Sequence, residues 1–324
     1  MYVMNILRTG VRFNEVGVEY IQPLQVAGCL ANQTDFGYCD ADIAISLCDS
    51  LSRCRMILYL DKEPFVYVES GSPSAMPVVF IHGFPFSHEM WGSQLEAVGK
   101  HHRAIAYDVR GHGGSFAGDG QFTIEGHVED LIDLLDALKI PKTVVVGLSM
   151  GGYIALRALE RNPERFRAAV LCDARSEADG DEGKLKRFAS MKAVKKEGPA
   201  AFADGFVRNV FAPDTFTSNP RAIEEIRTVI RRMSALSIAG TMLALACRTD
   251  TTASLSRISI PTLILVGELD VTTPPSASLS MHERIRGSEL HIVPHAAHMS
   301  NLENPAFFNE KLTSFLDRVA SMKP

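Results

Sequence analysis

Short, continuous runs of apolar residues recur along the chain from about residue 56, and each run predicts a strand. Two neighbouring runs, Ile57–Leu60 and Pro64–Glu69, are typical of a strand hairpin. Further buried strands are expected at Pro77–Ile81, Arg103–Tyr107, Thr143–Val146, Arg167–Leu171, Pro261–Val266 and Ser288–Val293. Helical spacing separates most of them, over residues 88–98, 124–138, 151–161, 276–286 and 304–319. Because strands that alternate with helices pair in parallel, the pattern predicts an α/β fold with a mostly parallel central sheet flanked by helices.

The alternation of strand and helix is interrupted once and is missing at the N-terminus. Residues 176–257 are mostly helix-forming, so we expect an inserted helical cap between two parts of one α/β core, residues 56–175 and 258–324. Residues 1–55 show no sustained period, and we expect an atypical, poorly ordered extension. Because the regular pattern begins at Met56, our hypothesis is that this methionine is the natural start.

Composition and charge narrow the possible partners and compartment. The 324 residues are 46% hydrophobic and 22% charged with a net charge of −5, which argues against nucleic acid or an anionic membrane as partner. No run reaches the roughly 18 apolar residues of a transmembrane helix. Four of the six cysteines precede residue 55, and only Cys172 and Cys247 fall in the expected core. A disulfide framework is therefore not expected, and the cytoplasm is the predicted location.

The strongest candidate for chemistry is the serine at the end of the Thr143–Val146 strand. It lies in Gly147-Leu148-Ser149-Met150-Gly151, the Gly-x-Ser-x-Gly pattern of a nucleophile elbow, and a helix-forming segment follows. A sharp strand-to-helix turn lifts the serine hydroxyl clear of the backbone, and the small glycines on either side avoid clashes. The alternative is an ordinary glycine-rich turn that happens to contain a serine.

A nucleophilic serine needs a base and an acid that orients the base. Asp270 lies just beyond a buried strand, where the carboxyl ends of parallel strands open into one crevice. Its alternative role is to cap the segment that starts near Thr273. Asp173 also follows a strand and is a second candidate for the acid.

Five motifs together resemble the α/β-hydrolase fold family, in particular its small-molecule esterase, lactonase and cofactor-free perhydrolase branch. In chain order they are His82-Gly83-Phe84, Asp108-x-Arg110-Gly111-x-Gly113-x-Ser115, Gly147-x-Ser149-x-Gly151, Gly267-Glu268-Leu269-Asp270 and His298-Met299-Ser300-Asn301-Leu302-Glu303. The resemblance covers roughly residues 65–319. It implies a catalytic triad of Ser149, Asp270 and His298.

The resemblance also implies the remaining parts of the site. The family usually has glycine where this chain has His295, so His295 is a second candidate for the base. One oxyanion-hole N–H is expected from Met150, the residue after the nucleophile, and the other by resemblance from Phe84. His82 is expected to brace its loop and Trp91 to pack beneath it.

The predicted activity is hydrolysis of a small-molecule carboxylic ester or lactone through an acyl-enzyme. Two alternatives stay open: a carbon–carbon bond hydrolase of dienoic acids, and a non-catalytic receptor on the same scaffold. No cluster of histidines or carboxylates has metal-ligand spacing, and residues 108–115 have no lysine for a phosphate, so no metal and no cofactor are expected. In the cap, we expect Phe206 and Phe211 to line an apolar pocket. A basic stretch, residues 184–196, is either a solvated helix face or an attraction for an anionic substrate. Nothing in the sequence indicates an oligomeric state.

Overall fold

The sheet organises the computed structural model, which describes residues 47–48 and 54–322. In these residues the sheet has nine strands in the order β1-β2-β3-β5-β4-β6-β7-β8-β9. The strands are β1 (Leu47–Cys48), β2 (Cys54–Leu60), β3 (Glu63–Ser70), β4 (Pro77–Ile81), β5 (Arg103–Tyr107), β6 (Thr143–Leu148), β7 (Phe166–Cys172), β8 (Thr262–Gly267) and β9 (Glu289–Val293). From β5 to β9 all neighbours are parallel, and β1, β2 and β3 extend the β5 edge in antiparallel pairs. The predicted α/β fold with a mostly parallel sheet is confirmed.

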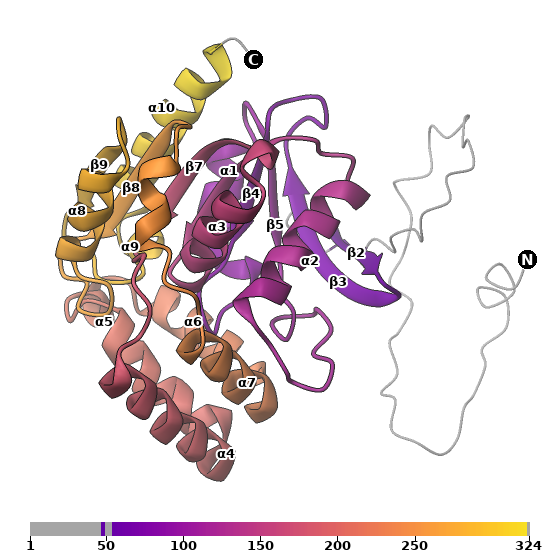
Figure 1. The fold of residues 1–324 in the computed structure, drawn as a ribbon. Coiled ribbons are helices and arrows are strands. Elements are labelled where there is room, and N and C mark those ends of the chain that lie inside the picture. The colour runs from indigo at the N-terminus through magenta and orange to yellow at the C-terminus, as the bar shows by residue number, and fades with distance from the viewer. Residues whose placement is uncertain (1–46, 49–53, 323–324) are drawn as a thin grey trace, which may run out of the picture. The chain divides into compact units, whose positions relative to one another are not determined.

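Helices cover the sheet. Those of the α/β core are α1 (Gly92–Val98), α2 (Ile124–Ala137), α3 (Met150–Arg161), α8 (Pro275–Arg284), α9 (Ser300–Glu303) and α10 (Pro305–Ser321), with short 3₁₀ turns at His88–Trp91 and Pro163–Arg165. α1 packs against α10, and α2 packs against α3, which contacts β4, β6 and β7 (Figure 1). All six residues of β6 are buried, because a central parallel strand is covered on both faces. This explains why its sequence is one unbroken apolar run.

The hairpin at the start of the described core agrees with the pattern, although β2 begins at Cys54, three residues before the expected Ile57. Arg55 pairs with Val68, and β1 pairs with β2 through Leu47 and Arg55. The expected extension, residues 1–55, otherwise lies outside the described residues.

Between β7 and β8 the chain forms the inserted segment, residues 176–257. It contains α4 (Asp181–Val210), α5 (Thr215–Ser218), α6 (Pro220–Arg232), α7 (Ala235–Ala246) and a 3₁₀ turn at Thr252–Arg257. α4 to α7 gather together below the sheet in the view of Figure 1. Among the described residues, no single helix has both the length and the apolar composition needed to cross a bilayer, and α6 and α7 meet those criteria only jointly, at a bend of 100°.

The longest helix, α4, is bent. Gly198 has φ 85° and ψ 169°, a conformation open essentially to glycine, and Pro199 follows it. Because proline cannot donate the hydrogen bond that would continue the first half, the chain restarts its helix in a new direction. α4 therefore consists of two helical halves that meet at a bend and pack against α6 and α7.

Candidate active site

Ser149 lies at a sharp turn between β6 and α3. Its φ is 53° and its ψ is −112°, a strained conformation for a residue with a side chain. The turn tolerates only glycine at its two flanks: a Cβ on Gly147 would lie 2.2 Å from the carbonyl oxygen of Gly151, and one on Gly151 would lie 2.1 Å from that of Ile81. The local sequence is thus explained by the close approach of β6, α3 and β4.

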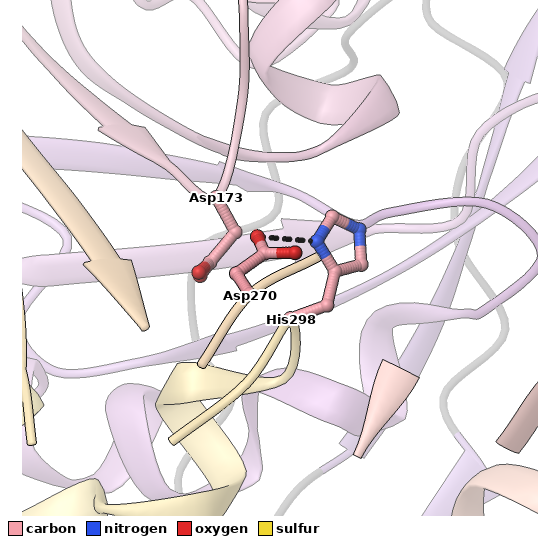
Figure 2. A group of neighbouring side chains, drawn as sticks. All are labelled: Asp173, Asp270 and His298. Atoms are coloured by element: carbon pink, nitrogen blue, oxygen red, sulfur yellow. Dashed lines mark hydrogen bonds and ion pairs between the residues drawn. The ribbon is translucent and has the colours of Figure 1, made fainter. Parts of the chain in front are cut away.

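His298 and Asp270 form a buried pair near this turn. His298 lies in the loop after β9 and Asp270 follows β8, and their Nδ1 and Oδ2 atoms are 2.8 Å apart (Figure 2). Since the carboxylate occupies Nδ1, the proton of the neutral imidazole belongs on Nδ1, and Nε2 is left as an acceptor. His298 and Ser149 both line the same pocket.

Asp270 is stabilised in its charged form by several donors. The N–H groups of Thr272 and Thr273 donate to Oδ1 at 2.8 and 3.0 Å, and the Thr273 hydroxyl donates to Oδ2 at 2.6 Å. Burial alone would raise the pKa of Asp270, but the charge of His298 and these hydrogen bonds outweigh it and keep the pKa low. Asp270 therefore accepts the N–H groups of the turn that leads to α8 and, at the same time, holds the imidazole of His298 by a hydrogen bond.

Asp173, the other candidate for the acid, contacts different partners. It accepts hydrogen bonds from the N–H of Gly267 and the hydroxyl of Ser300, and Figure 2 draws no contact from it to His298. Burial, together with the charge of Asp270, raises the pKa of Asp173 well above its usual value. Asp173 is thus expected to be neutral beside an ionised Asp270.

The three side chains also bring potential metal ligands together. The ligand atoms of Asp173, Asp270 and His298 lie within 4.8 Å of one another. Asp270 and His298, however, are joined directly by a hydrogen bond, so the Nδ1 position that a metal ion would need carries a proton instead. The arrangement suits a carboxylate–imidazole pair better than a metal centre.

His295, the other candidate for the base, is exposed and is not part of the pocket lining. Its φ is 59°, in the left-handed region that favours glycine, and its N–H donates to Glu268 at 3.0 Å. The backbone thus has the conformation that glycine would adopt at this position.

The loop after β4 faces the turn at Ser149. Phe84 is buried there and lines the pocket, while Met150 is the first residue of α3, so its N–H has no acceptor within the helix. His82 holds the loop: its Nε2 accepts the N–H of Val109 at 3.0 Å, and its Nδ1 donates to the carbonyl of Gly83 at 2.9 Å. Trp91 is fully buried against Phe80 and Phe308.

The pocket has a volume of about 550 Å³ and lies between the sheet and α4. Both halves of α4 contribute to its wall, through Val194 on one side of the bend and Phe202 and Phe206 on the other. The rings of Phe202 and Phe206 lie 6.2 and 5.9 Å from that of Phe84. Phe211, expected in the lining, is instead buried in the core and is absent from the pocket. It is the residue that directly follows α4, and its side chain packs into the core.

Charged residues at the pocket are mostly paired. Asp179 forms ion pairs with Arg187 and, at 2.8 Å, with the buried Arg248, whose guanidinium lies 4.5 Å from the Tyr153 ring. Lys186 pairs with Glu182 at 2.8 Å. The basic stretch on α4 is therefore balanced by neighbouring acids where it meets the pocket.

Sequence reasoning assigned no role to Thr273 or Glu303. Thr273 bonds both members of the pair, and Glu303 accepts the N–H of Ala297, next to His298. Thr273 lies three residues after Asp270, a spacing typical of an aspartate-capped turn, and this spacing is a signal that could have found it.

Comparison with known proteins identifies the class of enzyme. The profile described as "Alpha/beta hydrolase family" matches residues 78–311, so the chain belongs to this family and is a hydrolase. It is 28% identical to 3-oxoadipate enol-lactonase 2 of Acinetobacter baylyi over 253 residues, which are 78% of this chain and 92% of the relative.

The solved structures similar to this one include an esterase and an enol-lactonase. A thermophilic esterase from Thermogutta terrifontis has a TM-score of 0.77 and 30% identity, covering 86% of this chain and 99% of its own. The enol-lactonase from Burkholderia xenovorans has a TM-score of 0.76 and 27% identity, covering 81% and 99%. The expectation of a hydrolytic enzyme is thus confirmed at the level of the class.

Proposed function

We propose that the protein hydrolyses small-molecule carboxylic esters or lactones through an acyl-enzyme on Ser149, with His298 as base and Asp270 as its acid. One observation carries the proposal: a strained serine lines the same pocket as His298, whose imidazole is hydrogen-bonded to the buried carboxylate of Asp270. The relatives support this choice of bond, since one is an enol-lactonase and another is an esterase.

The proposed reaction has two stages, acylation of Ser149 and hydrolysis of the acyl-enzyme. Ser149 Oγ attacks the carbonyl carbon while His298 Nε2 takes the hydroxyl proton, and Asp270 stabilises the imidazolium. The N–H groups of Met150 and Phe84 donate to the oxyanion of the tetrahedral intermediate. Collapse breaks the bond to the leaving oxygen, which receives the proton from His298. Water then attacks the acyl carbon and gives a proton to His298. Collapse of this second intermediate breaks the bond to Ser149 Oγ, which takes the proton back from His298, and the acid is released.

We expect the pocket to bind a compact acyl or alcohol group of the substrate. Phe84, Phe202 and Phe206 provide an aromatic wall beside Ser149, which suits an apolar substrate portion. We also place the enzyme in the cytoplasm as part of this proposal, because Cys172 and Cys247 are both free thiols.

Turnover of a chromogenic acetate ester, extended to a panel of acyl lengths and lactones, tests the proposal. We expect Ser149→Ala and His298→Ala to lose at least about a thousandfold in kcat/KM, since triad members act as a unit. His295→Ala is the matched control and retains activity, because its side chain lies outside the pocket. If His295→Ala were inactive and His298→Ala active, the base would be misassigned. Full activity in Ser149→Ala would contradict the acyl-enzyme itself.

A further inference from the structure

Glu303, the last residue of α9, joins two segments that are far apart in the chain. Its Oε2 accepts the N–H of Ala212 at 2.8 Å and the hydroxyl of Thr215 at 2.6 Å. Its Oε1 accepts the N–H of Ala297 at 2.8 Å. Ala212 and Thr215 belong to the junction between α4 and α5, whereas Ala297 immediately precedes His298. One carboxylate therefore contacts both the inserted segment and the loop of the proposed base.

Every one of these partners is a donor. A carboxylate can satisfy them all, because both of its oxygens only accept hydrogen bonds, whereas a glutamine offers a single acceptor oxygen. Burial raises the pKa of Glu303, against the hydrogen bonds from Thr215 and from the backbone of Ala212, Ala297 and Met299. The N–H of Ala297 directly precedes His298, so its hydrogen bond to Glu303 restrains the backbone beside the imidazole.

The donors cannot easily find other partners. Ala212, Thr215 and Ala297 are each at most 4% exposed, so water is largely excluded from them. A buried donor that loses its acceptor incurs the full desolvation cost, and the backbone shifts to avoid it. A shift at Ala297 moves His298, and a shift at Ala212 moves the end of α4, whose Phe206 and Asn209 line the pocket.

We propose that Glu303 is a positioning residue that couples the α4–α5 junction to the loop of His298, so that the pocket wall and the base are held in one arrangement. The inference rests on the proposed function, in which His298 takes the proton from Ser149. Glu303 touches neither reacting group; it acts through the backbone of its neighbours.

A double-mutant cycle tests this coupling. Glu303→Gln removes one acceptor oxygen, and Thr215→Val removes one of the two donors on the inserted segment while keeping the N–H of Ala212. The readouts are kcat and KM for the smallest chromogenic ester and the rate at which a fluorophosphonate labels Ser149, which depends on the base. Glu310→Gln is the matched control, because Glu310 is exposed on α10 and pairs with Lys311 at 2.9 Å, away from the pocket.

We expect Glu303→Gln to lower kcat and the labelling rate together by about tenfold or more, with little change in KM. Thr215→Val should lower the labelling rate by about threefold in the parent and have no further effect in Glu303→Gln, because the coupling passes through the carboxylate. Glu310→Gln should resemble the parent.

Other outcomes overturn the coupling. A lower melting temperature with unchanged kcat and labelling, measured well below that temperature, would reduce Glu303 to a stabilising contact. Independent, additive effects of the two substitutions would show that the two segments are not linked through Glu303. If Glu303→Gln fails to fold, the labelling rate of Ser149 in Thr215→Val alone tests the coupling. An unchanged labelling rate in Thr215→Val would contradict the proposal. Failure of the proposed function is distinguishable, because Ser149→Ala would then retain turnover and the label would attach elsewhere.

Discussion

Asp270 and Asp173 lie side by side at the buried end of the sheet, yet their surroundings favour opposite charge states. Donors from Thr272, Thr273 and His298 keep the pKa of Asp270 low despite burial. Burial and the neighbouring charge of Asp270 raise the pKa of Asp173. Two carboxylates so close together are not expected to be ionised at once, and His298 stabilises the charge on Asp270.

Asparagine substitutions distinguish the two acids. Asp270→Asn removes the charge that stabilises the imidazolium and disturbs its tautomer, so we expect kcat to fall by about a thousandfold or more. Asp173→Asn resembles the neutral acid in shape, and the expected loss in kcat is below about tenfold. Steady-state kinetics with circular dichroism as a folding control measures both. The reverse order of activities would assign the acid to Asp173.

The left-handed backbone of His295 leads to a prediction about a glycine substitution at this position. At φ 59° an L-residue is strained, and its side chain is exposed. We expect His295→Gly to retain kcat within about twofold and to leave the free energy of unfolding unchanged or higher by up to about 1 kcal/mol. Urea denaturation measures the free energy of unfolding. A marked loss of stability would mean that the imidazole makes a contact that outweighs the strain.

At the scale of elements, the two phenylalanines near the end of α4 have separate roles. Phe206 lines the pocket and its ring lies 5.9 Å from those of both Phe84 and Phe86, whereas Phe211 is buried after the helix ends. Phe206→Ala should shift the preference among acyl lengths with little effect on the acetate ester. Phe211→Ala should cost about 3 kcal/mol of stability and leave the preference unchanged. A uniform loss on every ester in Phe206→Ala would place that ring in the core.

The strands could be predicted closely because continuous apolar runs mark buried parallel strands. The run predicted at Arg167–Leu171 is β7, Phe166–Cys172, and that at Pro261–Val266 is β8, Thr262–Gly267. Ser149, Asp270 and His298 could be proposed because each follows a strand or a recognisable motif. The bend of α4 has a local cause, Gly198 followed by Pro199, and this pair is a signal that could have found it. The bridge through Glu303 could not be predicted, because it depends on which side chains meet after folding. No local period records that Glu303 contacts Ala212.

At the scale of the whole molecule, buried histidines make the free energy of unfolding depend on pH. Burial lowers the pKa of His82 from 6.5 to about 4, and burial also lowers that of His112 well below its usual value. Above pH 6.5 His82 is neutral in both the folded and the unfolded state, so its contribution to the free energy of unfolding is fully present. As pH falls from 6.5 towards 4, the unfolded chain takes up the proton first and the folded state loses stability.

We therefore expect the free energy of unfolding to fall by about 3 kcal/mol from His82 alone across this pH range. Urea denaturation at a series of pH values measures it. His82→Gln, which cannot take up the proton, should be less stable at pH 7 but show a shallower decline. An identical slope in the two proteins would mean that other groups cause the acid sensitivity.

The bend of α4 at Gly198 has a consequence for how this enzyme can diverge. Between residues 183 and 209, both halves of the helix supply pocket wall, and none of the three residues proposed for the chemistry lies in that stretch. Duplicated copies can therefore accumulate substitutions there and acquire new substrate ranges while the reaction itself is inherited unchanged. A mutagenesis library confined to this stretch would sample selectivity in the same way, provided that the joint at Gly198 is left intact.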